Sequence, residues 1–196
     1  MTDPRPFWTW FAAAEIRLRA FRHGRDDDLL DELQGVLQSY SPGLWFEIGG
    51  HPDGPMELVI SAEGDEDYFA DVENLVKCAP ITEGWRFVTF KPPQGFGFKT
   101  EYEGVSVDPA QCWFLPLNST EDSPELGLRV AVPGLNVEQK KQYRAAVYIA
   151  IETGLGELQA WKTIKHVEVV SLPTSPEAEG YIELNELDKY LGWRAR

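Results

Sequence analysis

Residues 44–63 read LWFEIGGHPDGPMELVISAE, and this stretch decides the fold class. Leu44, Phe46 and Ile48 alternate with Trp45, Glu47 and Gly49 before a centre rich in glycine and proline. Alternate residues of a strand point to opposite faces of a sheet, so this period of two predicts a strand. The alternation resumes after the turn-forming residues, and the stretch therefore predicts a β-hairpin with one apolar face.

A helix and a third strand are expected after the hairpin. Asp65 can cap a helix whose apolar stripe ends before Pro80. Residues 85–90, WRFVTF, then predict a strand that ends at Pro92 and Pro93. Residues 44–93 therefore predict the order strand, strand, helix, strand.

The same order returns in residues 112–173. CWFLPL (112–117) and LGLRVAVPG (126–134) predict two strands, Asn136 can cap a helix, and HVEVVSL (166–172) predicts the last strand. Trp113 lies 68 positions after Trp45, and Leu128 lies 70 positions after Leu58. This weak internal similarity predicts two halves built on one ββαβ plan.

The flanking segments predict further helices. Residues 6–40 hold two amphipathic helices, and the acidic run at 26–28 suits the positive end of the second. Residues 94–111 are expected to form an extended connector between the halves, with residues 98–107 as a candidate additional strand. Near the end of the chain, Asn185 can cap a short helix at residues 186–191. Trp193 is expected to pack against the body after this helix, with an exposed Trp193 as the alternative.

The predicted fold is α+β. It consists of two ferredoxin-like split ββαβ halves, residues 44–93 and 112–173, with mainly antiparallel sheet, an N-terminal helix pair at 6–40 and a short C-terminal helix. We expect residues 1–196 to form a single compact domain, because each sheet on its own buries only one helix. Trp45 is expected to be buried beneath the N-terminal helices and Trp113 beneath the segment 181–193. The alternative is that one of the two stays exposed beside Glu47 or Tyr102 and faces a ligand.

The charge of the chain favours some partners over others. It holds 32 acidic and 18 basic side chains and has a net charge of −14. Such a field repels phosphate backbones and attracts basic proteins, so we expect no nucleic acid and propose a basic protein as the partner. The sequence does not indicate an oligomeric state.

The sequence predicts a cytoplasmic protein. Its N-terminus lacks a secretory pattern, and no apolar run approaches the roughly 18 residues of a membrane span, so no membrane partner is expected. Cys78 and Cys112 lie far apart and form no CxxC motif, and they are expected to be reduced and packed.

No motif in the chain predicts catalysis, a cofactor or a metal. The three histidines, His23, His51 and His166, fall in three different predicted elements. Gly95 and Gly97 resemble a nucleotide loop, but no third glycine follows at the required spacing. We therefore expect no catalytic residue, no cofactor and no metal site.

The candidate binding surface consists of two tryptophans, a glutamate and a tyrosine: Trp45, Glu47, Tyr102 and Trp113. The first-half acids Glu47 and Glu63 have no acidic counterpart in the second half, where Leu115 and Pro133 take their places. The fold unit therefore does not need these acids. They are either a specialisation of the first half or solvated positions on one sheet face.

Two functions fit these observations. The first is a non-enzymatic protein that binds another, basic protein, in an immunity- or inhibitor-like role. The alternative is a small-molecule-binding protein or enzyme, with a cleft between the two α/β halves lined by the four candidate residues.

Several stretches also resemble a known group of sequences. LWFEIGG, ELVISAEGD and GWRFVTFKPP in the first half, with DPAQCWFLPL and LGLRVAVPG in the second, resemble an uncharacterised family of bacterial proteins of about this length. The resemblance spans most of the chain. It implies a bacterial cytosolic α/β protein and carries over no catalytic residue, cofactor or partner.

Overall fold

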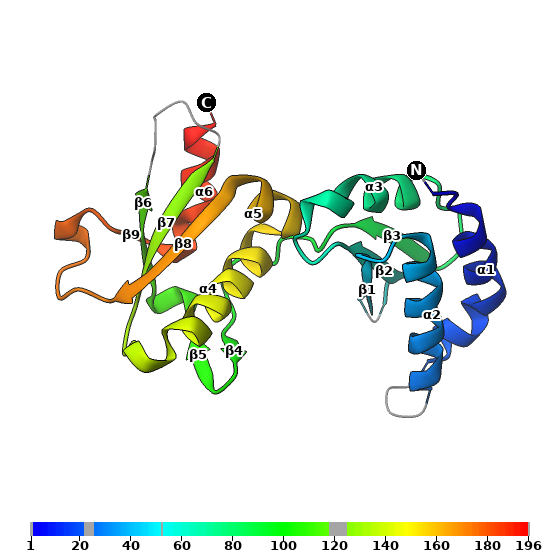
Figure 1. Ribbon diagram of the computed structural model, residues 1–196, viewed down its shortest axis with the longest axis horizontal. Coiled ribbons are helices and arrows are strands. Elements are labelled where there is room, and N and C mark those ends of the chain that lie inside the picture. The colour runs from blue at the N-terminus through cyan, green and yellow to red at the C-terminus, as the bar shows by residue number, and fades with distance from the viewer. Residues whose placement is uncertain (1, 22–25, 52, 118–124, 196) are drawn as a thin grey trace. The chain divides into compact units, whose positions relative to one another are not determined.

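The computed structural model describes residues 2–21, 26–51, 53–117 and 125–195 (Figure 1). Within these residues it contains six α-helices and three small β-sheets, which confirms the predicted α+β class. The chain divides into two compact units, Met1–Lys91 (unit 1) and Pro92–Arg196 (unit 2). The boundary coincides with the prolines that were predicted to end the first half. That residues 1–196 behave as a single domain remains a prediction.

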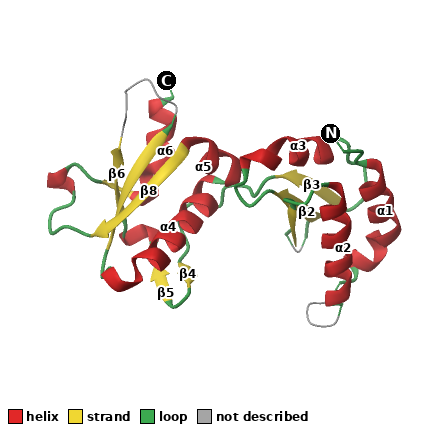
Figure 2. Ribbon diagram, in the orientation of Figure 1, coloured by secondary structure: helices red, strands yellow, loops and turns green. Residues whose placement is uncertain are grey.

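Unit 1 combines three helices with a three-stranded sheet of order β1-β2-β3 (Figure 2). Its elements are α1 (Arg5–Arg19), α2 (Asp27–Tyr40), β1 (Trp45–Gly49), β2 (Met56–Ser61), α3 (Phe69–Lys77) and β3 (Trp85–Thr89). β1 and β2 form the predicted antiparallel hairpin, and β3 returns parallel to β2 after α3. A strand that follows a crossover helix is expected to pair in this way.

The helices of unit 1 pack into one layer over the sheet. Phe11 of α1 makes edge-to-face ring contacts with Trp85 and Phe87 of β3. The indole nitrogen of Trp8 donates a hydrogen bond of 2.9 Å to the Leu75 carbonyl, which joins α1 to α3. α2 is joined to α3 in turn by the 2.8 Å hydrogen bond from the Ser41 hydroxyl to Asp71.

Unit 2 contains a four-stranded sheet of order β8-β7-β6-β9 and a separate hairpin of β4 and β5. Its elements are β4 (Thr100–Tyr102), β5 (Val105–Val107), β6 (Trp113–Leu117), β7 (Leu126–Val132), α4 (Lys140–Leu155), α5 (Glu157–Thr163), β8 (Ile164–Ser171), β9 (Ile182–Glu183) and α6 (Leu187–Arg194). β6 is antiparallel to β7, and β8 returns parallel to β7 after α4 and α5. Each main sheet is therefore mixed.

The start of unit 2 is fastened to α4. The Gln94 and Gly95 amides donate hydrogen bonds to the carbonyls of Thr153 and Gly154. A side chain at Gly154 would lie only 2.3 Å from the ring of Phe96, so this close approach requires glycine. The segment that was predicted to connect the halves therefore belongs to unit 2.

The two units share their strand register. Trp45 pairs with Ser61 and Phe46 with Ile60 in unit 1, and Trp113 pairs with Ala131 and Phe114 with Val130 in unit 2. These pairs keep the offsets of 68 and 70 that the sequence alignment gives.

The links from hairpin to helix are also alike. Gly64 and Gly134 follow the second strand with positive φ angles of 82° and 66°. The side chains of Asp65 and Asn136 then accept hydrogen bonds from the amides of Asp67 and Glu138, which confirms both as capping residues. In each unit the capped segment is a turn of 3₁₀-helix that leads into the α-helix.

Two elements of unit 2, α5 and β9, are absent from the sequence-based prediction, and the β4-β5 hairpin replaces the single strand considered at residues 98–107. Gly156, with a φ of 80°, ends α4 as expected, but the chain re-enters a helix at once as α5. The expected extended connector contains the β4-β5 hairpin, which turns at Glu103 and Gly104 with φ angles of 45° and 83°. β9 adds a two-residue strand beside β6.

Several side-chain predictions are wrong. Trp193 is 68% exposed and Trp45 is 47% exposed, although both were expected to be buried. Asn185 does not cap the last helix, because Glu186 occupies that position. Cys78 is exposed rather than packed. The turn at residues 118–124, between the two strands of the second half, lies outside the described residues.

Among the described residues, none of the helices has the length and apolar character needed to cross a bilayer.

Candidate functional site

The four candidate binding residues are divided between the two units. Trp45 and Glu47 lie on β1 of unit 1, on the same side of the strand and both exposed. Tyr102 ends β4 of unit 2 and is 37% exposed, whereas Trp113 begins β6 and is half-buried. The cleft that they were expected to line stays a prediction.

Trp45 and Glu47 belong to a sheet face that we call the open face of unit 1. The register places them beside Ser61 and Val59 of β2, and Val59 beside Val88 of β3. The alternation of strand side chains turns this face away from the face that holds Leu58 and Phe87. The full set of open-face side chains is Trp45, Glu47, Glu57, Val59, Ser61, Arg86 and Val88.

Ion pairs hold the charged groups of the open face. The Lys91 ammonium lies 2.7 Å from Glu63 and 3.9 Å from Glu47, and its side chain is only 19% exposed. Arg86 pairs with Glu57 across the β2-β3 ladder. The partly buried Lys91 therefore lies between two carboxylates whose side chains are each about half exposed.

An acidic rim adjoins the Trp45 end of the open face. It consists of the exposed residues Glu63, Asp65, Glu66 and Asp67, which follow β2 directly. The Glu63 amide donates a 2.9 Å hydrogen bond to the hydroxyl of Ser61, the strand partner of Trp45. Unit 1 holds 17 acidic and 8 basic side chains in its sequence, against 15 and 10 in unit 2, so it carries most of the excess negative charge.

The corresponding face of unit 2 is covered by its own chain. β9 pairs with β6, and a Cβ atom at Gly180 would lie 3.7 Å from the Leu115 side chain, which is ordinary contact. Tyr181 lies beside Arg129 of β7. Ala131 and its counterpart Ser61 are both buried, so the difference in cover lies at the tryptophans, of which Trp45 is exposed and Trp113 is half-buried. The tryptophan-bearing faces of the two units therefore differ in both charge and cover.

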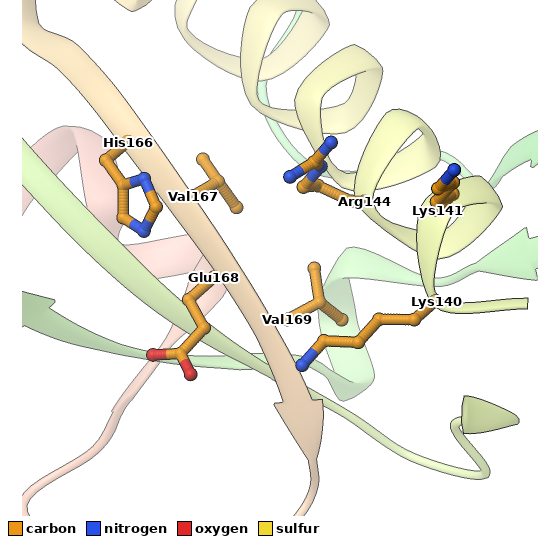
Figure 3. A pocket seen from close by; sticks show the side chains of 7 residues that line it. All are labelled: Lys140, Lys141, Arg144, His166, Val167, Glu168 and Val169. Atoms are coloured by element: carbon orange, nitrogen blue, oxygen red, sulfur yellow. The ribbon is translucent and has the colours of Figure 1, made fainter. Parts of the chain in front are cut away.

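A groove of about 300 Å³ lies between α4 and β8 of unit 2 (Figure 3). Val167 and Val169 point from β8 toward the helix, and Lys140 and Arg144 extend from the helix toward the strand. The complete lining is Lys140, Lys141, Arg144, His166, Val167, Glu168 and Val169. The sequence signal for this groove is the cationic run at the start of the helix that follows Asn136, but only the structure places β8 opposite it.

The described residues offer little for catalysis. Burial, and to a lesser degree the charge of Asp108, raises the pKa of Cys112 to about 12, so its thiol stays protonated at neutral pH and is a poor nucleophile. Across the described ranges, no group of three histidine, cysteine or acidic side chains could hold a metal ion. His51 and His166 are exposed in different units, and His23 lies outside the described residues.

The chain was compared with known proteins. No family model matches it, and neither do any curated proteins or solved structures. The function is therefore inferred from the geometry of the two units.

Proposed function

We propose that the protein is a non-enzymatic binding protein whose open face receives a basic surface of another protein. The observation that carries this proposal is the 47% exposure of Trp45 at the end of a sheet that is bordered by the acidic rim. A half-exposed tryptophan offers a flat apolar surface on which an arginine or lysine can stack. Carboxylates around it would attract the same cations from a distance.

The difference between the units supports a binding role for this face. Trp113, at the matching register position, is half-buried, and its face is covered by the segment that contains Gly180 and Tyr181. Trp45 is 47% exposed, and α1 of unit 1 packs on the opposite face of the sheet, against Trp85 and Phe87. An exposed aromatic side chain on a rigid strand is a common anchor for protein recognition.

The chemistry of the surface defines the partner. Lys91 and Arg86 hold the central carboxylates in ion pairs, whereas Asp65, Glu66 and Asp67 of the rim face solvent. A partner with a protruding arginine or lysine beside further basic residues would match this arrangement. An immunity- or inhibitor-like role, in which a bacterial cytoplasmic protein occludes a basic toxin or nuclease, fits this description.

The proposal includes a shared origin for the two units. Equal strand register, positive φ at Gly64 and Gly134, and equivalent caps at Asp65 and Asn136 support duplication of one ferredoxin-like ββαβ element. An experimental structure tests it: the backbones of residues 44–91 and 112–171 should superpose over both hairpins and helix starts. A different register in either hairpin would reject it.

Capture from a lysate of the native host, followed by mass spectrometry, tests the binding role. Trp193→Ala provides a matched control, because Trp193 is an even more exposed tryptophan in unit 2. We expect one basic protein to be retained by the wild type and by Trp193→Ala, and lost with Trp45→Ala. This protein should also elute at about 0.5 M salt, because salt at that concentration screens the attraction between charges that lie more than a few ångströms apart.

Titration calorimetry with the purified partner then measures the effect of each feature. Trp45→Ala, and separately the neutralised rim Asp65→Asn, Glu66→Gln, Asp67→Asn, should each weaken binding about tenfold or more. Equal affinity of Trp45→Ala and the wild type for every captured protein would reject the open face as the binding site.

A further inference from the structure

The groove between α4 and β8 presents a concentration of positive charge in an acidic chain. Lys140, Lys141 and Arg144 all line it from the first two turns of α4. Within the described parts of the chain, Lys141 and Arg144 have no ion-pair partner. Acidic side chains outnumber basic ones by 32 to 18, so unpaired cations gathered at one groove require an explanation.

These cations lie close to the start of a helix. The first turn of an α-helix is positively polarised, so acidic side chains are preferred there. α2 and α3 have Asp27, Asp28 and Asp71 in their first turns, and the 3₁₀ turn that leads into α4 has Glu138. The three cations follow this turn and line the groove.

Glu168 offsets only part of this charge. Its carboxylate accepts a 2.7 Å hydrogen bond from Arg129, a residue that does not line the groove. That hydrogen bond is the main cause of the lowered pKa of Glu168, and the charges of Lys140 and His166 contribute less. Lys141 and Arg144 therefore line the groove without an acidic partner among the described residues.

The strand side of the groove adds apolar surface and a backbone donor. Val167 and Val169 are almost fully buried and form an apolar wall. β8 is an edge strand, and the Val167 amide points away from β7, because it donates a 3.1 Å hydrogen bond to the Tyr148 hydroxyl. Strand alternation directs the Val169 amide to the same edge, beside the groove.

We propose that this groove binds a small organic phosphate. A phosphate dianion would sit between Lys140, Lys141 and Arg144, with the Val169 amide as a further donor. The apolar part of the molecule would lie over the floor of the groove, beneath which Val167 and Val169 are buried. A volume of about 300 Å³ matches a compact ligand rather than a long polymer. A chain with a net charge of −14 also disfavours nucleic acid as the source of the phosphate.

NMR titration of the full-length protein tests this proposal with phenyl phosphate as the probe at low ionic strength. We expect saturable shifts of the Lys140, Arg144 and Val169 amides, and tighter binding than for inorganic phosphate. Lys140→Gln, Lys141→Gln, Arg144→Gln in one variant should weaken binding about tenfold or more, because it removes the charge-assisted contacts.

A second triple variant separates the groove from general charge effects. Lys99→Gln, Lys162→Gln, Lys189→Gln removes the same amount of charge from exposed positions of unit 2 outside the groove. It should bind phenyl phosphate within about twofold of the wild type. Equal loss of binding in both triple variants would overturn the proposal, as would the absence of saturable shifts in the wild type.

An acidic peptide is the competing occupant, since β8 is an edge strand of its sheet. A heptaglutamate peptide in the same titration distinguishes the two. Shifts along β8 with the peptide, but none with phenyl phosphate, would overturn the small-molecule assignment and favour strand addition at the edge. Binding of phenyl phosphate alone supports the proposal.

Discussion

The two units have one strand plan and two different surfaces. β1-β2 and β6-β7 pair in equivalent register, and each hairpin leads through a capped turn to a helix and a parallel strand. Unit 1 leaves its tryptophan-bearing face open and acidic. Unit 2 covers the matching face with its own chain and places cations along the edge of its sheet.

This difference separates what the fold requires from what can vary. Leu58 and Leu128, at matching positions of the second strands, are fully buried in both units. The side chains that alternate with them change from Glu47 to Leu115 and from Ser61 to Ala131. We therefore infer that function lies in the alternating positions and in the segments that cover them, and the following predictions test this comparison.

The largest expected contrast is in thiol reactivity. Leu44 and Cys112 occupy matching positions just before β1 and β6, and both are buried, whereas Cys78 is exposed after α3. Because burial also raises the pKa of Cys112 to about 12, Cys78 should react with iodoacetamide at least ~10³-fold faster in the native protein. Peptide mapping by mass spectrometry measures both rates. Similar rates would contradict the burial of Cys112.

The same thiol reports on cooperativity between the units. If residues 1–196 unfold as one domain, Cys112 becomes reactive over the same urea range in which the ellipticity of the whole protein is lost. Reactivity that begins at a clearly different urea concentration would show separate unfolding. Stable fragments from proteolysis near residues 94–111 would lead to the same conclusion.

The second contrast concerns the matching phenylalanines. Phe114 is fully buried and contacts the ring of Tyr190, whereas Phe46 is only half-buried. Phe114→Ala should cost about 3–5 kcal/mol of unfolding free energy, and Phe46→Ala about 1–2 kcal/mol, because less apolar area is lost. Urea denaturation measures both. Leu58→Ala and Leu128→Ala, both at fully buried sites, should agree within about 1 kcal/mol.

The matching tryptophans give a smaller contrast of the same sign. Trp45 is 47% exposed and Trp113 is half-buried beside β9. Trp113→Ala should cost about 2–3 kcal/mol, and Trp45→Ala about 1 kcal/mol or less. An equal and large loss at both sites would restore the original expectation that both are core residues. It would also remove Trp45 as a binding anchor.

Much of the fold could be predicted because its signals are local. Period-two alternation identified both hairpins. Asp65 and Asn136 identified the helix starts, because each capping side chain accepts a hydrogen bond from an amide only two positions away. α5 was missed because Gly156 is both the last boundary of α4 and the first boundary of α5. A glycine in this position signals the end of a helix, and nothing else in the sequence signals that a new helix begins there. β9 was missed because two residues cannot show a period.

The binding surfaces could be predicted only in part. Trp45 and Glu47 were identified together because neighbours at a spacing of two share a strand face. Their exposure could not be predicted, because it depends on which face the helices cover. Lys140 and Arg144 were overlooked for the same reason: a charged helix face gains meaning only when β8 is placed opposite it.

The smallest expected effect is at the cross-strand ion pair of unit 2, which parallels Glu57 and Arg86 of unit 1. The Arg129 hydrogen bond holds the pKa of Glu168 below its ordinary value of 4.5. A lowered pKa in the folded state stabilises the fold at pH values above 4.5, and this stabilisation is lost as the pH falls through the folded-state pKa. Glu168→Gln should therefore lower the free energy of unfolding by about 0.5 kcal/mol at pH 7. The effect is small because the side chains of Arg129 and Glu168 are 38% and 35% exposed, and solvent screens their ion pair.

Urea denaturation at a series of pH values measures this effect. The difference between the wild type and Glu168→Gln should shrink toward zero as the pH is lowered below 4.5. Glu179→Gln, at an exposed position in a 3₁₀ turn of unit 2, serves as the control and should match the wild type throughout. A difference for Glu168→Gln that persists unchanged into acid would show that Glu168 contributes through packing of its aliphatic stem, because protonation removes its ion pair with Arg129 but leaves that packing in place.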